Sequence, residues 1–200
     1  MDKDTIKAGL KAAIFQRRST RAYKADPVPE ELLGEIVEAG VYSPSASNGQ
    51  KTHFFVITNP EKRAELREVM TKVLAAIPAE KGMPEVFLSL IQRANEGEVD
   101  VTYGAPALIV TTNEKGSMNA AADTAIALEN MMLTASACGL GNVWVNQFLM
   151  LRDAPELKEF FAGIGVTQNM LVYGALAVGY AEALETEPLP RRGDPVTFVR

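Results

Sequence analysis

The sequence predicts an α+β fold built as a single domain. Helical patterns outnumber strand patterns, and the two do not alternate as they do in a doubly wound parallel sheet. The 200 residues fit one domain, and an apolar fraction of 47% with 22% charged residues is enough for a sizeable core. We therefore expect one domain over residues 1–200, with a variable insertion or cap at about 78–103 outside the main sheet.

Six segments carry the apolar spacing of helices. Ile6, Leu10 and Ile14 recur at helical spacing and predict a helix with one buried face over about 5–16. Prolines and acidic residues before Leu32 mark the start of a second helix. The other four helices are expected at 60–77, 86–93, 119–137 and 155–161. The helix at 119–137 is rich in Ala, Met and Leu almost all round, so we expect it to be buried on most sides.

Short apolar and β-branched runs predict the strands. They lie at 54–58, 107–112, 143–148 and 170–180. The chain from residue 185 onward is rich in proline and is expected to be extended.

Charge and composition exclude several classes of protein. A net charge of −5 argues against a surface for nucleic acid or an anionic membrane, and no apolar run is long enough to span a bilayer. The single cysteine and single histidine exclude a disulfide within the chain and a metal site of several cysteines or histidines. The N-terminal residues do not have the pattern of a signal peptide, so we expect a cytoplasmic protein. The single cysteine and the single histidine also lead us to expect no bound metal.

The usual catalytic motifs are missing from the sequence. It contains no Gly-x-Ser-x-Gly elbow, no Gly-x-Gly-x-x-Gly fingerprint and no phosphate-loop Gly-Lys-Ser/Thr pattern. If the protein is an enzyme, a cofactor has to supply the difficult chemical step.

The first candidate binding segment is Arg-Arg-Ser-Thr-Arg at 17–21. Guanidinium groups donate paired N–H bonds to anionic oxygens, so this composition suits a phosphate ester. The alternative is a solvated basic helix end, which the helix dipole favours.

Three further features are candidates on weaker grounds. The small polar side chains at 44–50 can meet the donors and acceptors of a heterocycle, although an ordinary connecting loop has the same composition. Arg191 and Arg192 form a second basic pair, or simply a charged C-terminus. Trp144 fits a core position and a cofactor wall equally well.

The order of these motifs resembles the nitroreductase family of FMN flavoproteins. The resemblance covers nearly the whole chain and is weakest at 78–103. It rests on five motifs in sequence: Arg-Arg-Ser-Thr-Arg-Ala-Tyr (17–23), Pro-Ser-Ala-Ser-Asn-Gly-Gln (44–50), Gly-Ala-Pro-Ala-Leu-Ile-Val (104–110), Gly-Leu-Gly-Asn-Val-Trp (139–144) and a late arginine.

The resemblance implies a homodimer with a central, mostly antiparallel sheet, helices around it and a C-terminal tail exchanged between subunits. It places two FMN molecules in the subunit interface and assigns no catalytic side chain, because the chemistry occurs at flavin N5. The cofactor-binding residues that it implies are Arg17, Arg18, Ser19 and Arg21 in one subunit, Pro44, Ser45, Asn48 and Gln50 from the other, Trp144, Asn146 and Gln147 near N5, and Arg191 and Arg192 on the phosphate.

The implied activity is a ping-pong transfer of hydride from NADH or NADPH to a small organic acceptor such as a nitroaromatic or a quinone. Arg21 and Lys51 are candidates for stabilising the reduced flavin. Lys51 replaces a frequent proline, and Asn146-Gln147 replaces a frequent glycine-bearing pair, so the sequence departs from the family pattern at the flavin edge. The alternatives are a specialised flavin chemistry such as dehalogenation or flavin breakdown, a non-catalytic FMN-binding or redox-sensing protein, and a helical dimerisation module without flavin.

Overall fold

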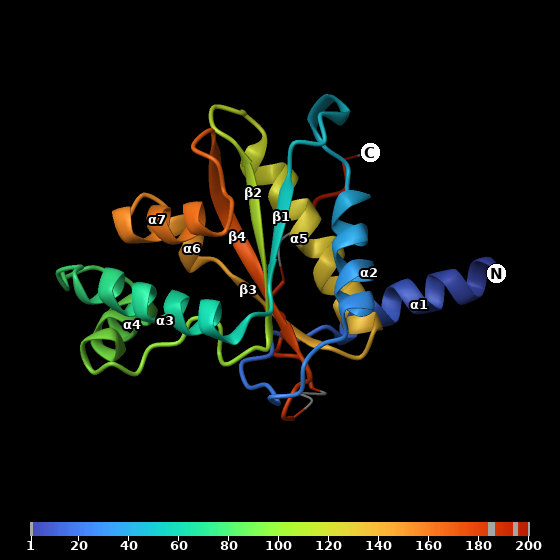
Figure 1. Ribbon diagram of the computed structural model, residues 1–200. Coiled ribbons are helices and arrows are strands. Elements are labelled where there is room, and N and C mark those ends of the chain that lie inside the picture. The colour runs from blue at the N-terminus through green and yellow to red at the C-terminus, as the bar shows by residue number, and fades with distance from the viewer. Residues whose placement is uncertain (1, 184–186, 194–195, 200) are drawn as a thin grey trace.

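Four antiparallel strands form the sheet at the centre of the molecule (Figure 1). The computed structural model describes residues 2–183, 187–193 and 196–199. Among these residues the strand order is β1-β2-β4-β3, which leaves β1 and β3 at the edges. The strands are β1 (His53–Ile57), β2 (Ala107–Glu114), β3 (Gly141–Val145) and β4 (Met170–Gly179). The prediction of an α+β fold with an antiparallel sheet is confirmed.

Helices cover both faces of this sheet. One face carries α3 (Pro60–Ala75), α4 (Glu85–Asn95), α6 (Gln147–Leu151) and α7 (Pro155–Gly163), and the other carries α2 (Glu30–Val41) and α5 (Ala120–Ala137) (Figure 1). Side chains alternate along the central strands, so Leu108 and Val110 enter the first core and Ala107 and Ile109 the second. A sheet that is covered on both faces explains why β2 and β4 read as almost continuous apolar runs.

The segment at 78–103 contains the predicted short helix, as α4. Its buried residues Ile91 and Ala94 lie on the side of α4 that packs toward α3. Farther on, Val99 and Val101 are almost fully buried and belong to the core formed with Leu108 and Val110. The end of this segment is therefore fixed to the main sheet through its valines.

The strand predicted at 143–148 ends earlier than expected. β3 stops at Val145, and α6 begins at Gln147. Phe148 is buried, but it is buried from a helix, in the core on the α6 face. The apolar run continues across the boundary because both elements are covered, and a short apolar run does not distinguish a buried strand from a buried helix.

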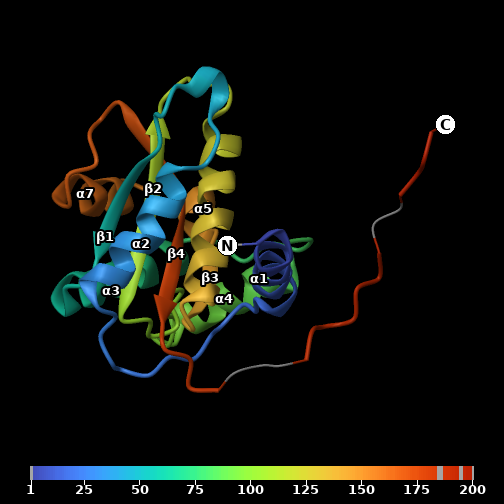
Figure 2. The same cartoon turned by 90° about the vertical axis from the view of Figure 1, so that its right-hand side faces the viewer.

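The first helix, α1 (Lys3–Gln16), forms as predicted but has no buried residue within the chain. Ile6, Leu10 and Ile14 are 50%, 56% and 46% exposed, which corrects the expectation of a buried face. Asp2 caps the helix by accepting from the amides of Asp4 and Thr5. Figure 2 shows α1 standing off the body of the molecule beside α5. Local periodicity predicts an apolar face correctly, but it does not say whether the same chain covers that face.

The helix α5 is covered on most sides, as predicted, but one stripe of it is open. Eight of its residues are buried, yet Ile126 is 41% exposed and Ala122, Glu129 and Ala137 are exposed too. Together with the half-buried Leu133, these positions recur every three or four residues and form one open stripe along the helix. The expectation of burial on most sides is confirmed, with this one stripe left open in the single chain.

The C-terminal tail leaves the body after β4 and runs away from it (Figure 2). Residues 187–193 and 196–199 have no helix or strand, which fits the predicted extended tail, while residues 184–186, 194, 195 and 200 of that prediction lie outside the described residues. Leu189, Phe198 and Val199 are 83%, 81% and 94% exposed. Among the helices of the described residues, none is long and apolar enough to cross a membrane.

Candidate functional site

The basic segment at 17–21 runs along the open edge of the sheet. The amide of Thr20 donates to the carbonyl oxygen of Asn142 at 2.9 Å, and Ser19 forms a parallel bridge with the same residue. Because β3 is an edge strand, its outer side is free to accept this extra backbone pairing. The segment is thereby held on the sheet rather than projecting as a solvated helix end.

A buried tyrosine, Tyr23, also holds the basic segment on the sheet. The Tyr23 hydroxyl lies 2.9 Å from the carbonyl oxygen of Thr20 and 3.3 Å from that of Ala177 in β4, and it donates to this pair of acceptors. Burial raises the pKa of Tyr23, the neighbouring Tyr103 raises it further, and Arg21 opposes the shift. The hydroxyl therefore keeps its proton over the physiological range and remains a donor.

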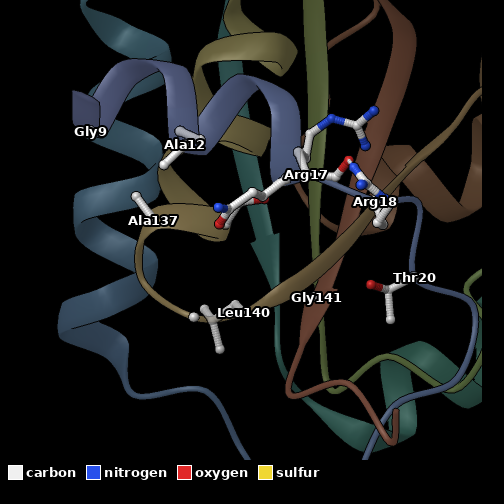
Figure 3. A pocket seen from close by; sticks show the side chains of 12 residues that line it. Gly9, Ala12, Arg17, Arg18, Thr20, Ala137, Leu140 and Gly141 are labelled. Atoms are coloured by element: carbon white, nitrogen blue, oxygen red, sulfur yellow. Dashed lines mark hydrogen bonds between the residues drawn. The ribbon is translucent and has the colours of Figure 1, made fainter. Parts of the chain in front are cut away.

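A hollow of about 710 Å³ opens beside the basic segment. Figure 3 shows Arg17, Arg18 and Thr20 on one side of it and the end of α5 with Leu140 and Gly141 on the other. The volume lies within the roughly 300–1,000 Å³ that is usual for ligand pockets. The rest of the wall is made of small and polar residues, namely Gly9, Ala12, Ala13, Gln16, Ser136, Ala137 and Gly139.

The glycine at 141 allows the segment to approach β3. A Cβ at this position would lie 2.7 Å from both Cγ2 and Oγ1 of Thr20, which is closer than side-chain atoms pack. Gly139, at the end of α5, has φ +77° and closes the helix, as expected from the sequence. The Gly-Leu-Gly motif thus has two separate tasks, a helix end and a close backbone contact.

The four predicted ligands of the segment, Arg17, Arg18, Ser19 and Arg21, are placed differently with respect to the hollow. Arg17 and Arg18 line the hollow together with Thr20, whereas Ser19 and Arg21 are not among its lining residues. The guanidinium of Arg21 lies over the ring of Tyr103 at 5.9 Å from its centroid. Arg18 turns back instead, and its Nη1 donates to the carbonyl oxygens of Phe15 and Arg17, both at 2.8 Å. Arg18 therefore secures the end of α1, and it also lines the hollow.

The second predicted cluster, residues 44–50, is an exposed and tightly shaped loop around the 3-10 turn Ala46–Asn48. Ser45 Oγ accepts from the amide of Gln50 at 3.0 Å, and the Gln50 amide group donates to Asn48 Oδ1 at 3.1 Å. Three non-glycine residues of the loop have positive φ, at Ser47, Asn48 and Gln50. Such backbone costs free energy and is concentrated at functional sites.

One carboxylate of α5 holds this loop. Asp123 is 8% exposed, lies in the first turn of the helix and accepts from the amide of Ala46 at 3.1 Å. The loop is therefore attached to the N-terminal end of α5, whereas the basic segment lies at its C-terminal end, beside Ser136 and Gly139. Figures 1 and 2 agree that the two clusters lie at opposite ends of the molecule. One chain does not bring them together.

The residues expected near flavin N5 lie at the junction of β3 and α6. Trp144 is 39% exposed and packs its indole against Gly174, where an added Cβ would lie 2.6 Å from Nε1. Asn146 occupies the N-cap position of α6, and Gln147 is its first residue. The indole is neither core nor free surface, so it forms a partly open wall.

Three further cationic residues, Lys51, Arg191 and Arg192, are not part of the basic segment. Lys51 is paired with Glu114, with Nζ 2.5 Å from Oε2. Arg191 and Arg192 are exposed in the tail, which leaves the body of its own chain (Figure 2). Within the described part of one chain, the late arginines are not brought to Arg17.

Several residues of the site carried no readable signal. Asn142 is fully buried and supports the basic segment through its carbonyl, while its amide group donates to Met132 O and Ser136 Oγ. Asp123 and Tyr103 were not singled out either, because a lone acid in a helix and a lone aromatic in a loop are common. Within the described ranges, no group of three or more His, Cys, Asp or Glu side chains is arranged to hold a metal.

Known proteins share the fold of this chain. A solved structure of a nitroreductase with bound FMN from Bacteroides fragilis is 33% identical, with a TM-score of 0.84, and the match covers 96% of this chain and 98% of that one. The FMN-dependent nitroreductase NfnB of Mycobacterium smegmatis, solved in complex with NADPH, is 23% identical with a TM-score of 0.75 over 98% of this chain and 100% of that one, which shows a shared fold.

Sequence comparison identifies a flavin oxidoreductase as a relative and a matching protein family. An NADPH-flavin oxidoreductase of Vibrio harveyi is 25% identical over 169 residues, which are 84% of this chain and 64% of that protein. The sequence profile of the family described as Nitroreductase family matches residues 14–180, from the end of α1 to just past β4. The chain belongs to the nitroreductase family.

Proposed function

We propose that this protein is an FMN-dependent oxidoreductase that takes electrons from NADH or NADPH and passes them to a small organic acceptor. The observation that carries the proposal is the basic segment at 17–21, docked on β3 beside a hollow of about 710 Å³. The relatives bound to FMN and to NADPH support the choice of cofactor and donor.

The chain offers what the phosphate of FMN needs. Arg17, Ser19 and Arg21 belong to a segment whose backbone is fixed at both Thr20 and Tyr23 before a ligand arrives. Charge-assisted bonds from guanidinium groups offset the desolvation of a phosphate dianion. The ordered backbone reduces the conformational entropy that binding would otherwise cost.

A homodimer would complete this site. The helix α5 spans 18 residues, or about 27 Å at 1.5 Å per residue. If two copies pack α5 against α5 in opposite directions across a two-fold axis, the loop at 44–50 of one subunit meets the basic segment of the other. The open stripe of α5 and the uncovered apolar side chains of α1 are surfaces that such a dimer would bury.

The tail fits the same arrangement. It carries Arg191 and Arg192 together with exposed apolar side chains, and it extends away from its own chain. A tail that wraps onto the second subunit buries those side chains there and adds a guanidinium to the phosphate site. The exchange of tails remains a proposal, as does the choice between Arg191 and Arg192.

Bound FMN would accept hydride at N5 from the nicotinamide and then pass two electrons to the acceptor, in two half-reactions that share one site. The chain's contribution is to bind and orient. Trp144, Asn146 and Gln147 form the wall at the junction of β3 and α6, and the Arg21 guanidinium favours negative charge in its neighbourhood. No side chain is assigned as an obligatory proton donor.

We further propose that residues 78–103 help to select the acceptor, with nitroaromatics and quinones as the classes to test. The segment ends at Tyr103, which contacts Arg21, so a change in the segment is transmitted to the basic cluster. The sequence predicts a cytoplasmic location.

The decisive experiment is an anaerobic stopped-flow titration of the FMN-loaded protein with NADH and with NADPH, followed by mixing with nitroaromatic and quinone acceptors. Rapid bleaching of the flavin absorbance and its recovery on mixing support the proposal. Bound flavin that neither nucleotide reduces identifies a non-catalytic flavin protein. Bleaching without recovery by any of these acceptors identifies a specialised chemistry, and a colourless protein that does not bind FMN rejects the flavin altogether.

A further inference from the structure

A second hollow, of about 250 Å³, lies against the start of β4 and the helix α7. We refer to it as the β4–α7 hollow. Its mouth is bordered by Lys115, which follows β2 and donates its amide to the carbonyl oxygen of Asn169 at 2.8 Å. Since α7 and α5 cover opposite faces of the sheet (Figure 1), this hollow is separate from the one beside the basic segment.

The inner wall of the β4–α7 hollow is apolar. Phe161 of α7 and Met170 and Val172 of β4 line it, and all three are buried residues. They are part of the sheet and of a helix packed on it, so the wall is rigid. A ligand that enters this hollow therefore meets hydrocarbon and aromatic surface first, and only a ligand with an apolar body gains from it.

Three cationic side chains surround the same hollow, from three different elements. They are Lys115, Arg152 at the end of α6 and Lys158 of α7. Lys158 is paired with Asp153 at 3.1 Å, whereas neither Lys115 nor Arg152 has an ion pair within the described residues. In a chain of net charge −5, two uncompensated cations beside one apolar hollow form a local site for an anion.

Arg152 is held in place from within the protein. Its guanidinium lies over the ring of Tyr173 at 5.0 Å from the centroid, and its Nη1 is buried without a hydrogen-bond partner among the described residues. A buried donor left unpaired costs free energy, and the contact with the ring offsets only part of that cost. The contact with Tyr173 orients the side chain, and the guanidinium N–H groups other than the buried Nη1 can donate to a ligand in the hollow that Arg152 lines.

We propose that the β4–α7 hollow binds a small monocarboxylate with an apolar body, either a single aromatic ring or a short alkyl chain. The carboxylate accepts from Arg152 and Lys115, and the body packs on Phe161 and Met170. A volume slightly below that of typical ligand pockets limits the ligand to this size. The planar guanidinium matches a carboxylate in two parallel hydrogen bonds. The site does not depend on flavin.

The test uses the full-length protein saturated with FMN and sodium benzoate as the probe, at constant ionic strength. Calorimetric titration gives the affinity, and the amide signals of Leu171 and Thr167 in an NMR titration give the location. Benzyl alcohol, which has the same ring and no charge, is the control ligand. The test variants are Arg152→Gln and Lys115→Gln, and Lys62→Gln, which removes a lysine paired with Glu65 on α3, is the matched control.

The proposal predicts saturable benzoate binding with shifts at Leu171, binding weakened by about tenfold or more in Arg152→Gln and Lys115→Gln, and no change in Lys62→Gln. Benzyl alcohol should bind much more weakly. Lys115 is exposed, so its variant keeps the test valid even if Arg152→Gln loses its fold. Absence of saturable binding, equal binding of the alcohol, equal affinity in the Lys115 variant, or shifts confined to Trp144 and Asn146 would each overturn the proposal.

Discussion

The backbone amide of Thr20 donates to the carbonyl oxygen of Asn142 at 2.9 Å and so attaches the basic segment to the edge of the sheet. This single bond joins the first motif of the sequence to the fourth, more than a hundred residues away. It turns a run of arginines at a helix end into a fixed set of donors. The contact depends on the absence of a side chain at Gly141.

Replacing that glycine tests the contact. In Gly141→Ala, the new Cβ would meet Thr20 at 2.7 Å, so the segment must shift away from β3. We expect a loss of unfolding free energy of about 1–3 kcal/mol and weaker FMN retention. Gly34→Ala in α2 is the control, since its Cβ meets open space and alanine favours a helix. Equal thermal stability and flavin content in the two variants would contradict the role of Gly141.

The loop at 44–50 depends on one carboxylate. Asp123→Ala removes the acceptor for the amide of Ala46, and a charge-assisted bond of this kind is worth about 1.5–3 kcal/mol. We expect faster hydrogen exchange in residues 45–50 and weaker FMN binding, with the helix content unchanged. Exchange rates measured by mass spectrometry check the first effect. A loop as protected as in the unmodified protein would show that Asp123 does not hold it.

Two exposed apolar residues, one inside and one outside the proposed dimer interface, test the dimer. Ile126→Asp places a charge on the open stripe of α5 and should shift the protein toward monomers that lose flavin. Val86→Asp alters an even more exposed side chain on α4, outside the proposed interface, and should leave the dimer intact. Sedimentation velocity at several concentrations distinguishes the two. Identical sedimentation of both variants and the unmodified protein would place the interface elsewhere.

Removal of the tail tests its wrapping. A chain that ends before Pro188 lacks Arg191, Arg192 and the exposed apolar residues Leu189, Phe198 and Val199. We expect this chain to fold, because its core is complete without the tail, but to dissociate more readily and to release FMN faster. The flavin release rate and the sedimentation profile are the measurements. If neither changes, the tail has no part in the dimer or the phosphate site.

The sequence predicted the local elements well where one chain covers them. Apart from α1, the predicted helices and the four strands arise from apolar spacing that reflects burial against this sheet, for example at Leu108 and Ile109. Prediction was wrong at the end of β3, because the apolar run through Phe148 crosses from a strand into a helix. It was also wrong for α1, where apolar positions such as Leu10 are open in the single chain.

The sequence predicted which residue types form the candidate site, but it did not predict the contacts that hold them in place. The arginines and the Gly-Leu-Gly motif could be recognised, since their chemistry is explicit in the residue types. The support from Asn142, Tyr23 and Asp123 could not, because it consists of backbone pairing and single hydrogen bonds over long sequence separations. The position of Arg21 over Tyr103 has no local sequence signal either.

The most direct test of the central claim compares FMN with riboflavin, which has the same ring and ribityl chain but no phosphate. The dissociation constants of both are measured by flavin fluorescence for the unmodified protein and for Arg17→Ala, with Lys62→Gln as the charge control. If Arg17 holds the phosphate, the variant should bind FMN about tenfold or more weakly and riboflavin equally well. An equal loss for both ligands, or no loss for FMN, would contradict the assignment of the basic segment to the phosphate.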